Sequence, residues 1–245
     1  MDDADLYRRG AATLLASWQE YARGAPDAAV RHFPGVSAAV FPAGPERAVY
    51  NNALLERDLD AAARTAALDA MENAYAEAGV THFAAWVHES DKALRDDIER
   101  RGYTFAESSR VMGMVLDDLS APVPDIDLGP PDWSEYLRVL GTPPGLLEKA
   151  DSTAFHVLIA RLDGENAATA MAFDHHDDCG IYNVGTLEHA RRRGLGTALT
   201  VLHAHNARAR GCRTASLQST EMAERVYAAV GFRDLGRFFE YAPKG

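Results

Sequence analysis

Residues 181–199 read IYNVGTLEHARRRGLGTAL. A stretch that predicts a strand leads into a loop with Gly194 and Gly196, and a helix with leucines at 195, 199 and 202 follows. Glycine lets backbone N–H groups approach a ligand with no side chain in the way. The first turn of a helix also attracts anions, through its free N–H groups and its dipole. Because three arginines precede the glycines, this stretch predicts a phosphate or pyrophosphate site.

Two familiar phosphate loops do not fit this spacing. A dinucleotide-binding loop needs a third glycine, but Thr197-Ala198-Leu199 follows Gly196. A Walker loop needs Gly-Lys-Ser/Thr, which is also missing. A short Gly-x-Gly string with exposed arginines can equally be an ordinary helix start, so the loop needs support from elsewhere in the chain.

That support lies downstream of the loop. The string R-x-x-G-x-G begins at Arg191, and Y-x-x-x-G-F begins 36 residues later (227 − 191) at Tyr227. Hydrophobic periodicity and turn residues predict the elements around them. These are a helix at 132–140, strands at 154–162, 166–174 and 180–187, a helix at 194–210, a strand at 213–218, a helix at 221–230 and a strand at 233–241.

The two strings and this order of elements resemble the GNAT superfamily of N-acetyltransferases. The resemblance covers roughly residues 122–241. It implies an α/β (α+β) fold, with a mixed, mostly antiparallel sheet flanked by helices. It also implies that acetyl-CoA is the acyl donor and that no metal takes part.

The resemblance assigns roles to individual residues. The strand before the loop pairs by its backbone with the pantetheine arm, and Tyr227 is the general acid for the leaving thiolate. The alternative for Tyr227 is a buried helix tyrosine that packs on the sheet. Cys179 and Cys212 need no chemical role, because the amine attacks the thioester directly, and both are expected to pack inside the protein. The residues expected to contact the acyl-CoA are Val184, Gly185, Thr186, Arg191, Arg192, Arg193, Gly194, Leu195, Gly196, Thr197 and Ser219.

The general base is not assigned. Some family members carry a glutamate on the strand before the loop, but this strand has no carboxylate between 179 and 187, and Glu188 is expected to face solvent. Residues 174–178 (Asp-His-His-Asp-Asp) are interpreted as a solvated hairpin turn, with a base or a metal site as alternatives. A chain of waters can also carry the proton.

A Pro-rich connector at 119–132 predicts the domain boundary, with domains at 1–120 and 121–245. Helices and strands are expected in the first domain too. Its predicted elements are a helix at 5–24, a hairpin at 36–55 turning at 42–45, a helix at 60–78, a strand at 82–87, a helix at 91–101 and a strand at 103–116.

The two halves contain a similar pattern. A helix, a glycine, a strand, a helix and a Gly-aromatic pair recur, with Gly79 and Gly102 offset from Gly211 and Gly231 by 132 (211 − 79) and 129 (231 − 102). We interpret this pattern as a tandem whose N-terminal half is a degenerate GNAT-like domain. Chance similarity of two αβα segments is the alternative.

The N-terminal half is not expected to bind acyl-CoA. Residues 51–66 contain no glycine, and Ile98 stands where spacing from the glycine places the tyrosine. We expect this half to form one wall of the acceptor pocket, with Trp86, His88 and Glu89 within reach of it. Packing in the core and at its rim is the alternative for those three residues.

The net charge and the apolar content of the chain limit which binding partners are expected. The net charge of −11 disfavours a nucleic acid partner and suits a cationic amine, although acidity often serves solubility alone. The acidic N-terminus and the lack of a long apolar run predict a cytoplasmic protein with no membrane partner. A monomer or a homodimer is expected.

The predicted function is transfer of an acetyl group from acetyl-CoA to a primary amine of a small molecule. Three alternatives remain open. The acceptor can be a protein amine, the donor can carry a longer acyl group, or the chain can be a non-catalytic acyl-CoA-binding regulatory module.

Overall fold

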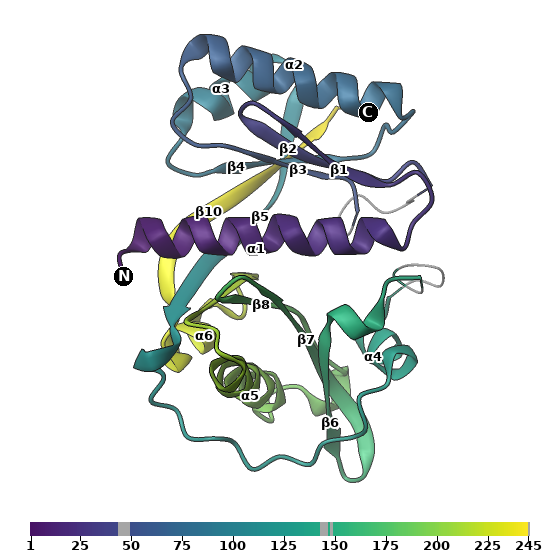
Figure 1. Ribbon diagram of the computed structural model, residues 1–245, viewed down its shortest axis with the longest axis vertical. Helices are drawn as coiled ribbons and strands as arrows, with labels where there is room; N and C mark the ends of the chain where they lie inside the picture. The colour runs from purple at the N-terminus through teal and green to yellow at the C-terminus, as the bar shows by residue number, and fades with distance from the viewer. Residues whose placement is uncertain (44–49, 143–146, 148, 245) are drawn as a thin grey trace. The chain divides into compact units, whose positions relative to one another are not determined.

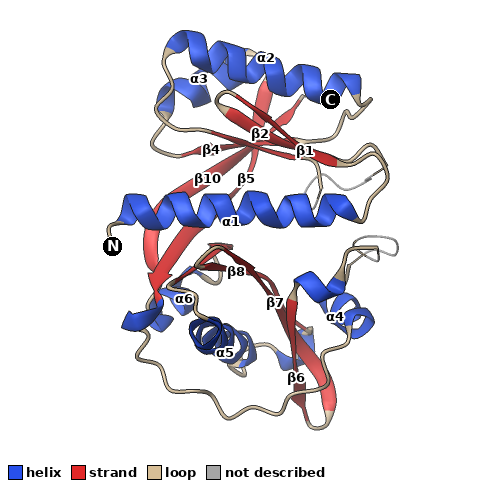
Figure 2. Ribbon diagram, viewed as in Figure 1, coloured by secondary structure: helices blue, strands red, loops and turns tan. Residues whose placement is uncertain are grey.

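A computed structural model describes residues 1–43, 50–142, 147 and 149–244. Figures 1 and 2 show a fold that contains both helices and strands. The α-helices are α1 (Asp3–Arg23), α2 (Ala61–Glu77), α3 (Lys92–Arg100), α4 (Trp133–Leu140), α5 (Leu195–Arg210) and α6 (Glu224–Val230). The strands are β1 (Ala29–Phe33), β2 (Val36–Val40), β3 (Asn52–Leu55), β4 (Ala84–His88), β5 (Tyr103–Val115), β6 (His156–Leu162), β7 (Glu165–His175), β8 (Asp178–Thr186), β9 (Thr214–Ser219) and β10 (Arg233–Pro243).

Local sequence accounts for where the helices begin and end. Asp60, Asp91 and Asp132 cap α2, α3 and α4 by accepting hydrogen bonds from backbone N–H groups in the first turn. Gly211 and Gly231 end α5 and α6 in the left-handed conformation, which costs glycine little. Each predicted helix and strand is present. The structure also contains β1, a strand that was not predicted. The predicted turn at 42–45 lies partly outside the described residues.

The described strands follow the order β1-β2-β3-β4-β10-β5-β9-β8-β7-β6, and most neighbours run antiparallel. The predicted mixed sheet flanked by helices is therefore confirmed. The chain divides into two compact units, each built from separate segments. Unit 1 contains residues 1–17 and 111–235, and unit 2 contains residues 18–110 and 236–245. The predicted domain boundary between residues 120 and 121 stays a prediction.

Unit 2 has its core between a sheet and two helices. The β1-β2-β3 meander is antiparallel, and β4 then pairs parallel to β3, with Asn52 opposite Ala84. The helices α2 and α3 cover one face of these strands (Figure 2). The core between them contains Leu68, Met71, Tyr75 and Ile98, all fully buried.

Unit 1 has the same plan. The β6-β7-β8 meander is antiparallel, and β9 pairs parallel to β8, with Asp178 opposite Thr214. Ala168 and Ala170 of β7 pack against Leu199 of α5, whereas Met171 contacts α4 through Tyr136. The two helices therefore lie on opposite faces of the meander (Figure 1). Met112, Met114 and Leu116 complete the core beneath α5.

Each unit is completed by the last strand of the other half. The end of β10 pairs with β4 in unit 2, with Tyr241 opposite Ala85. The end of β5, residues 111–115, belongs to unit 1, where β5 neighbours β9. The two halves thus repeat one pattern and exchange their final strands.

Candidate active site

The strands β8 and β9 separate soon after they begin. Along these two fully described strands, parallel pairing covers three positions and ends at Gly180 opposite Ser216. β8 continues to pair with β7 as far as Thr186. Residues 181–186 of β8 therefore have one edge that β9 does not occupy.

A β-bulge lies within that separated segment. Tyr182 is opposite Met171 and Gly185 is opposite Thr169, so two β8 residues, Asn183 and Val184, face the single residue Ala170. Asn183 has φ +53°, in the left-handed region.

The bulge reverses which residues point toward β9. Before it, the Asp177 carbonyl accepts hydrogen bonds from the N–H groups of Arg213 and Thr214. After it, the Leu187 N–H donates to the Ala167 carbonyl of the neighbouring β7 end, at 2.9 Å. Backbone groups alternate along a strand, so those of Val184 and Thr186 point to the open edge.

The start of α5 lies against this same segment. A Cβ atom built on Gly196 comes within 3.4 Å of the Val184 side chain and 3.8 Å of the Thr186 hydroxyl. Gly194 begins the helix with φ +77° and no side-chain cap. The N–H groups of the first turn have no acceptor within the helix, so a glycine start leaves them available to an anion.

Positive charge surrounds the helix start. Arg191, Arg192 and Arg193 are all exposed, and Arg192 has φ +63°. The Arg191 Nε donates to the Thr186 carbonyl at 3.3 Å, which ties the loop to the end of β8. The Leu195 side chain is buried and packs in the α5 core, and its contact with the acyl-CoA stays a prediction.

Tyr227 lies on α6 and is mostly buried. Its ring meets Phe232 edge-on, with centroids 6.2 Å apart. Burial raises the pKa of the Tyr227 hydroxyl, and a side-chain hydrogen bond with Thr200 opposes that rise. The Thr200 hydroxyl in turn donates to the Gly196 carbonyl at 2.9 Å. Tyr227 is thereby connected to the first turn of α5 through one residue.

Some of the residues predicted to contact acyl-CoA lie together in the structure, whereas others do not share these contacts. Val184, Thr186, Arg191 and Gly196 are linked by the contacts above. Gly185 faces the opposite side, where a Cβ atom would lie 3.3 Å from a Leu140 side-chain carbon of α4. Ser219 is buried at the end of β9 and donates to the Thr220 carbonyl at 2.9 Å. Their role in binding stays a prediction.

In the acidic and histidine-rich turn between β7 and β8, His176 is exposed, whereas Asp174 and Asp178 are hydrogen-bonded within the protein. Arg210 donates to Asp174 at 2.6 and 2.8 Å. Burial alone would raise the pKa of Asp174, but hydrogen bonds from Arg210 and His156 hold it well below its usual range. Asp178 is buried, and the hydroxyls of Thr214 and Ser216 donate to it at 2.6 and 2.8 Å.

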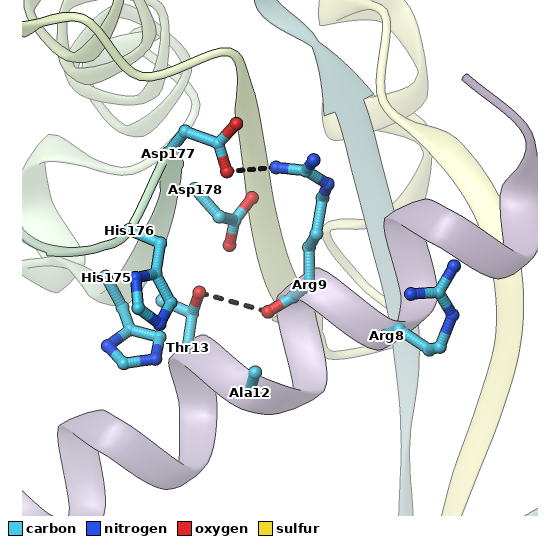
Figure 3. A pocket seen from close by; sticks show the side chains of 8 residues that line it. All are labelled: Arg8, Arg9, Ala12, Thr13, His175, His176, Asp177 and Asp178. Carbon is cyan, nitrogen blue, oxygen red and sulfur yellow. Dashed lines mark hydrogen bonds and ion pairs between the residues drawn. The ribbon is translucent and has the colours of Figure 1, made fainter.

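A pocket of about 320 Å³ lies between this turn and α1 (Figure 3). Arg9 pairs with Asp177 there, and the ring centroids of His175 and His176 lie 4.2 Å apart. Within the described part of the chain, no three His, Cys, Asp or Glu side chains are grouped so that they could hold a metal ion. The pocket lies at the start of β8, whereas the separated segment lies at the end of that strand.

Other predicted positions are found as follows. Cys179 and Cys212 are buried free thiols in the unit 1 core, and Glu188 is exposed, as expected. In unit 2, Trp86 is mostly buried, meets Trp18 edge-on and donates to Asn52 at 3.2 Å. His88 is buried beside Ser90, which fits the packing alternative.

Among the residues that the structure describes, no helix combines the length and the apolar character needed to cross a membrane.

Comparison with known proteins relates the chain to one family. The model of the Acetyltransferase (GNAT) family matches residues 119–232. No curated protein matches the sequence. The matched segment contains the predicted loop and all of Tyr227 to Phe232.

Solved structures match over nearly the whole chain. A GCN5-related N-acetyltransferase from Kribbella flavida is 18% identical, covers 96% of each chain and has a TM-score of 0.72. One from Sphaerobacter thermophilus is 18% identical over 98% of this chain and 93% of that chain, with a TM-score of 0.62. A Drosophila protein is 17% identical over 100% and 98%, with a TM-score of 0.63. This coverage includes the N-terminal half, so that half is GNAT-like in fold as well.

Proposed function

Because residues 119–232 match the model of the Acetyltransferase (GNAT) family and the whole chain has the fold of such enzymes, we propose that this protein transfers an acetyl group from acetyl-CoA to the primary amine of a small molecule. The observation that carries the proposal is the opening between β8 and β9 beside the start of α5. An elongated thioester with a pyrophosphate at one end requires both features at once.

The residues present fit such a donor. The open backbone edge at Val184 and Thr186 can pair with the amides of the pantetheine arm. The N–H groups after Gly194 and the exposed arginines at 191–193 suit the negative charge of a pyrophosphate. Thr197 and Ser219 are proposed to complete the same site.

The proposed reaction is direct attack. The amine nitrogen bonds to the thioester carbonyl carbon, and the carbon–sulfur bond breaks. Tyr227 gives its hydroxyl proton to the departing sulfur, and its buried position favours the protonated form that this role requires. The amine loses its own proton to water. Holding both reactants in line supplies much of the rate gain.

The charge of the protein guides the choice of acceptor. A net charge of −11 attracts cations, so we propose that the acceptor is a small cationic amine.

A thiol-release assay tests the function. The purified protein, acetyl-CoA and a panel of small amines, with a lysine peptide and an N-terminal peptide beside them, should release CoA only when a suitable amine is present. Succinyl-CoA and longer donors run in parallel measure acyl preference. Binding of acetyl-CoA with no amine-dependent release across the panel would instead support a non-catalytic module.

A further inference from the structure

The bulge in β8 is held by a side chain from α4. Asn183 donates from its Nδ2 to the Tyr136 hydroxyl at 2.9 Å. Asn183 is also the residue with left-handed φ at the bulge. Asparagine tolerates that conformation better than most residues, so one side chain both permits the turn and fixes it.

Tyr136 is a rigid anchor for this bond. It is fully buried, and its ring stacks on Trp133 with centroids 4.9 Å apart. Its hydroxyl also lies 3.6 Å from the Met171 sulfur of β7. The same helix presses on the next residues of β8, because Leu140 lies against Gly185. α4 therefore determines where residues 183–185 sit.

Moving the bulge would change the site. If β8 ran on without it, alternation would turn Asn183 and Gly185 toward α5 and the open edge, in place of Val184 and Thr186. The Val184 contact with Gly196 at the helix start would then be lost. Register in this segment thus decides which backbone groups face the opening.

We propose that Tyr136 and Asn183 are positioning residues for the acyl donor: their hydrogen bond fixes the β8 bulge and so aims the backbone of Val184 and Thr186 at the pantetheine arm. This inference rests on the proposed function, because it concerns the same opening. It assigns α4 a part in donor binding although none of its residues belongs to the predicted donor site.

Three variants separate the bond from the backbone conformation. Tyr136→Phe removes the hydroxyl and keeps the buried ring. Asn183→Gly keeps the left-handed φ and loses the bond, whereas Asn183→Ala loses both. Matched controls exist elsewhere in the chain. Asp163→Ala changes another exposed left-handed residue, with φ +54°, and Tyr75→Phe removes another fully buried hydroxyl, which donates to Ala39 at 3.1 Å.

The experiment measures the dissociation constant of CoA by calorimetry, and hydrogen exchange at the Val184 and Thr186 amides in the CoA complex, where pairing with the pantetheine arm would protect them. We expect Tyr136→Phe and Asn183→Gly each to weaken CoA binding by about twofold to tenfold, the range of one hydrogen bond. Asn183→Ala should weaken it further. Hydrogen exchange at the two amides should become faster, and the KM for acetyl-CoA should rise by a larger factor than kcat falls. The variant with both Tyr136→Phe and Asn183→Gly should lose no more CoA affinity than the single variant with the larger loss.

Two results would overturn the inference. One is CoA binding by Tyr136→Phe and Asn183→Gly equal to that of the wild type. The other is an equal loss in the controls, which would mark a general effect of destabilisation. In both cases wild-type binding and turnover still stand, so the proposed function survives. A wild-type protein that binds no CoA would remove the function and the inference together.

Discussion

At the scale of single residues, environment decides what Tyr227 can do. Its ring packs against Phe232, and its hydroxyl is linked through Thr200 to the start of α5. Burial raises its pKa, so the hydroxyl keeps its proton throughout the physiological pH range. That is the form in which a phenol can protonate a leaving thiolate.

Tyr227→Phe should therefore keep the fold and lose rate. The ring contact with Phe232 is retained, whereas the proton donor is removed. We expect kcat to fall by roughly 10²-fold or more, the usual contribution of a general acid, with the dissociation constant of acetyl-CoA changed much less. Steady-state kinetics and CoA calorimetry measure the two effects. Full turnover by the variant would remove the general-acid role.

His203 gives a prediction about pH and stability. It is fully buried on α5, and burial lowers the pKa of its imidazole to about 4, from 6.5. Between those values the unfolded chain binds a proton that the folded chain does not. The stability linked to neutral His203 is therefore complete above pH 6.5 and is lost as the pH falls toward 4, by up to about 1.4 kcal/mol per pH unit.

Urea unfolding at about pH 7.5, 6 and 5, values that span this titration, tests the expectation. His203→Gln keeps a polar side chain of similar size that does not titrate. We expect the free energy of unfolding of the wild type to fall more steeply across this range than that of the variant. Parallel curves for the two proteins would show that His203 does not titrate between the folded and unfolded states.

At the scale of elements, the start of α5 combines a helix end with an open strand edge. Gly194 and Gly211 begin and end this helix, both with positive φ and with no neighbouring atom within 4 Å of where a Cβ atom would lie. The two positions are chemically alike, but only the first directly follows the three arginines and lies two residues before Gly196, where an added Cβ atom would approach Val184. They offer a matched pair for separating stability from binding.

We expect Gly194→Ala and Gly211→Ala to cost similar stability, about 1 kcal/mol each, because alanine is strained in the left-handed region. Only Gly194→Ala should weaken CoA binding, since it disturbs the N–H groups of the first turn. Thermal unfolding and calorimetry compare the pair. Equal CoA affinities in the two variants would place the pyrophosphate elsewhere.

Sequence predicted the elements well because each is marked locally. Apolar spacing and the glycine after α5 identify that helix, and the same holds for α2 and its Gly79. β1 was not predicted because Arg31 and His32 interrupt its apolar pattern. The bulge was not predicted for another reason. Asn183 lies inside a stretch whose sequence is typical of a regular strand, and its hydrogen-bond partner Tyr136 is 47 residues away in the sequence. The only local signal is that asparagine favours left-handed φ.

At the scale of the whole molecule, the exchange of final strands means that each compact unit contains segments from both halves of the sequence. No periodicity in the sequence says which strand will neighbour β4 or β9, so this arrangement could not be read from local patterns. The core of unit 1 includes four residues that come before the connector or at its start: Met112, Met114, Leu116 and Leu119.

A fragment of residues 121–245 should therefore not fold alone. Loss of a large buried apolar side chain costs about 2–5 kcal/mol. Four such losses amount to about 8–20 kcal/mol, which is comparable with a typical total stability of about 5–15 kcal/mol. We expect no cooperative urea transition and a flat near-ultraviolet dichroism spectrum. As a control, the full chain cut once in the connector, near exposed Val123, should remain folded. Cooperative unfolding of the isolated fragment would contradict this expectation.

The exchange of final strands also determines when unit 2 can be completed during translation. Unit 2 has most of its residues by position 110 but is completed by residues 236–245, which are translated after all of unit 1. At about 5–20 residues per second, the 126 residues from 111 to 236 (236 − 110) take roughly 6–25 s. Throughout that interval β4 has an unpaired edge where Phe238 to Tyr241 will dock. Such edges invite association with other chains, so chaperone protection during synthesis should matter more for this protein than for one whose halves close in order.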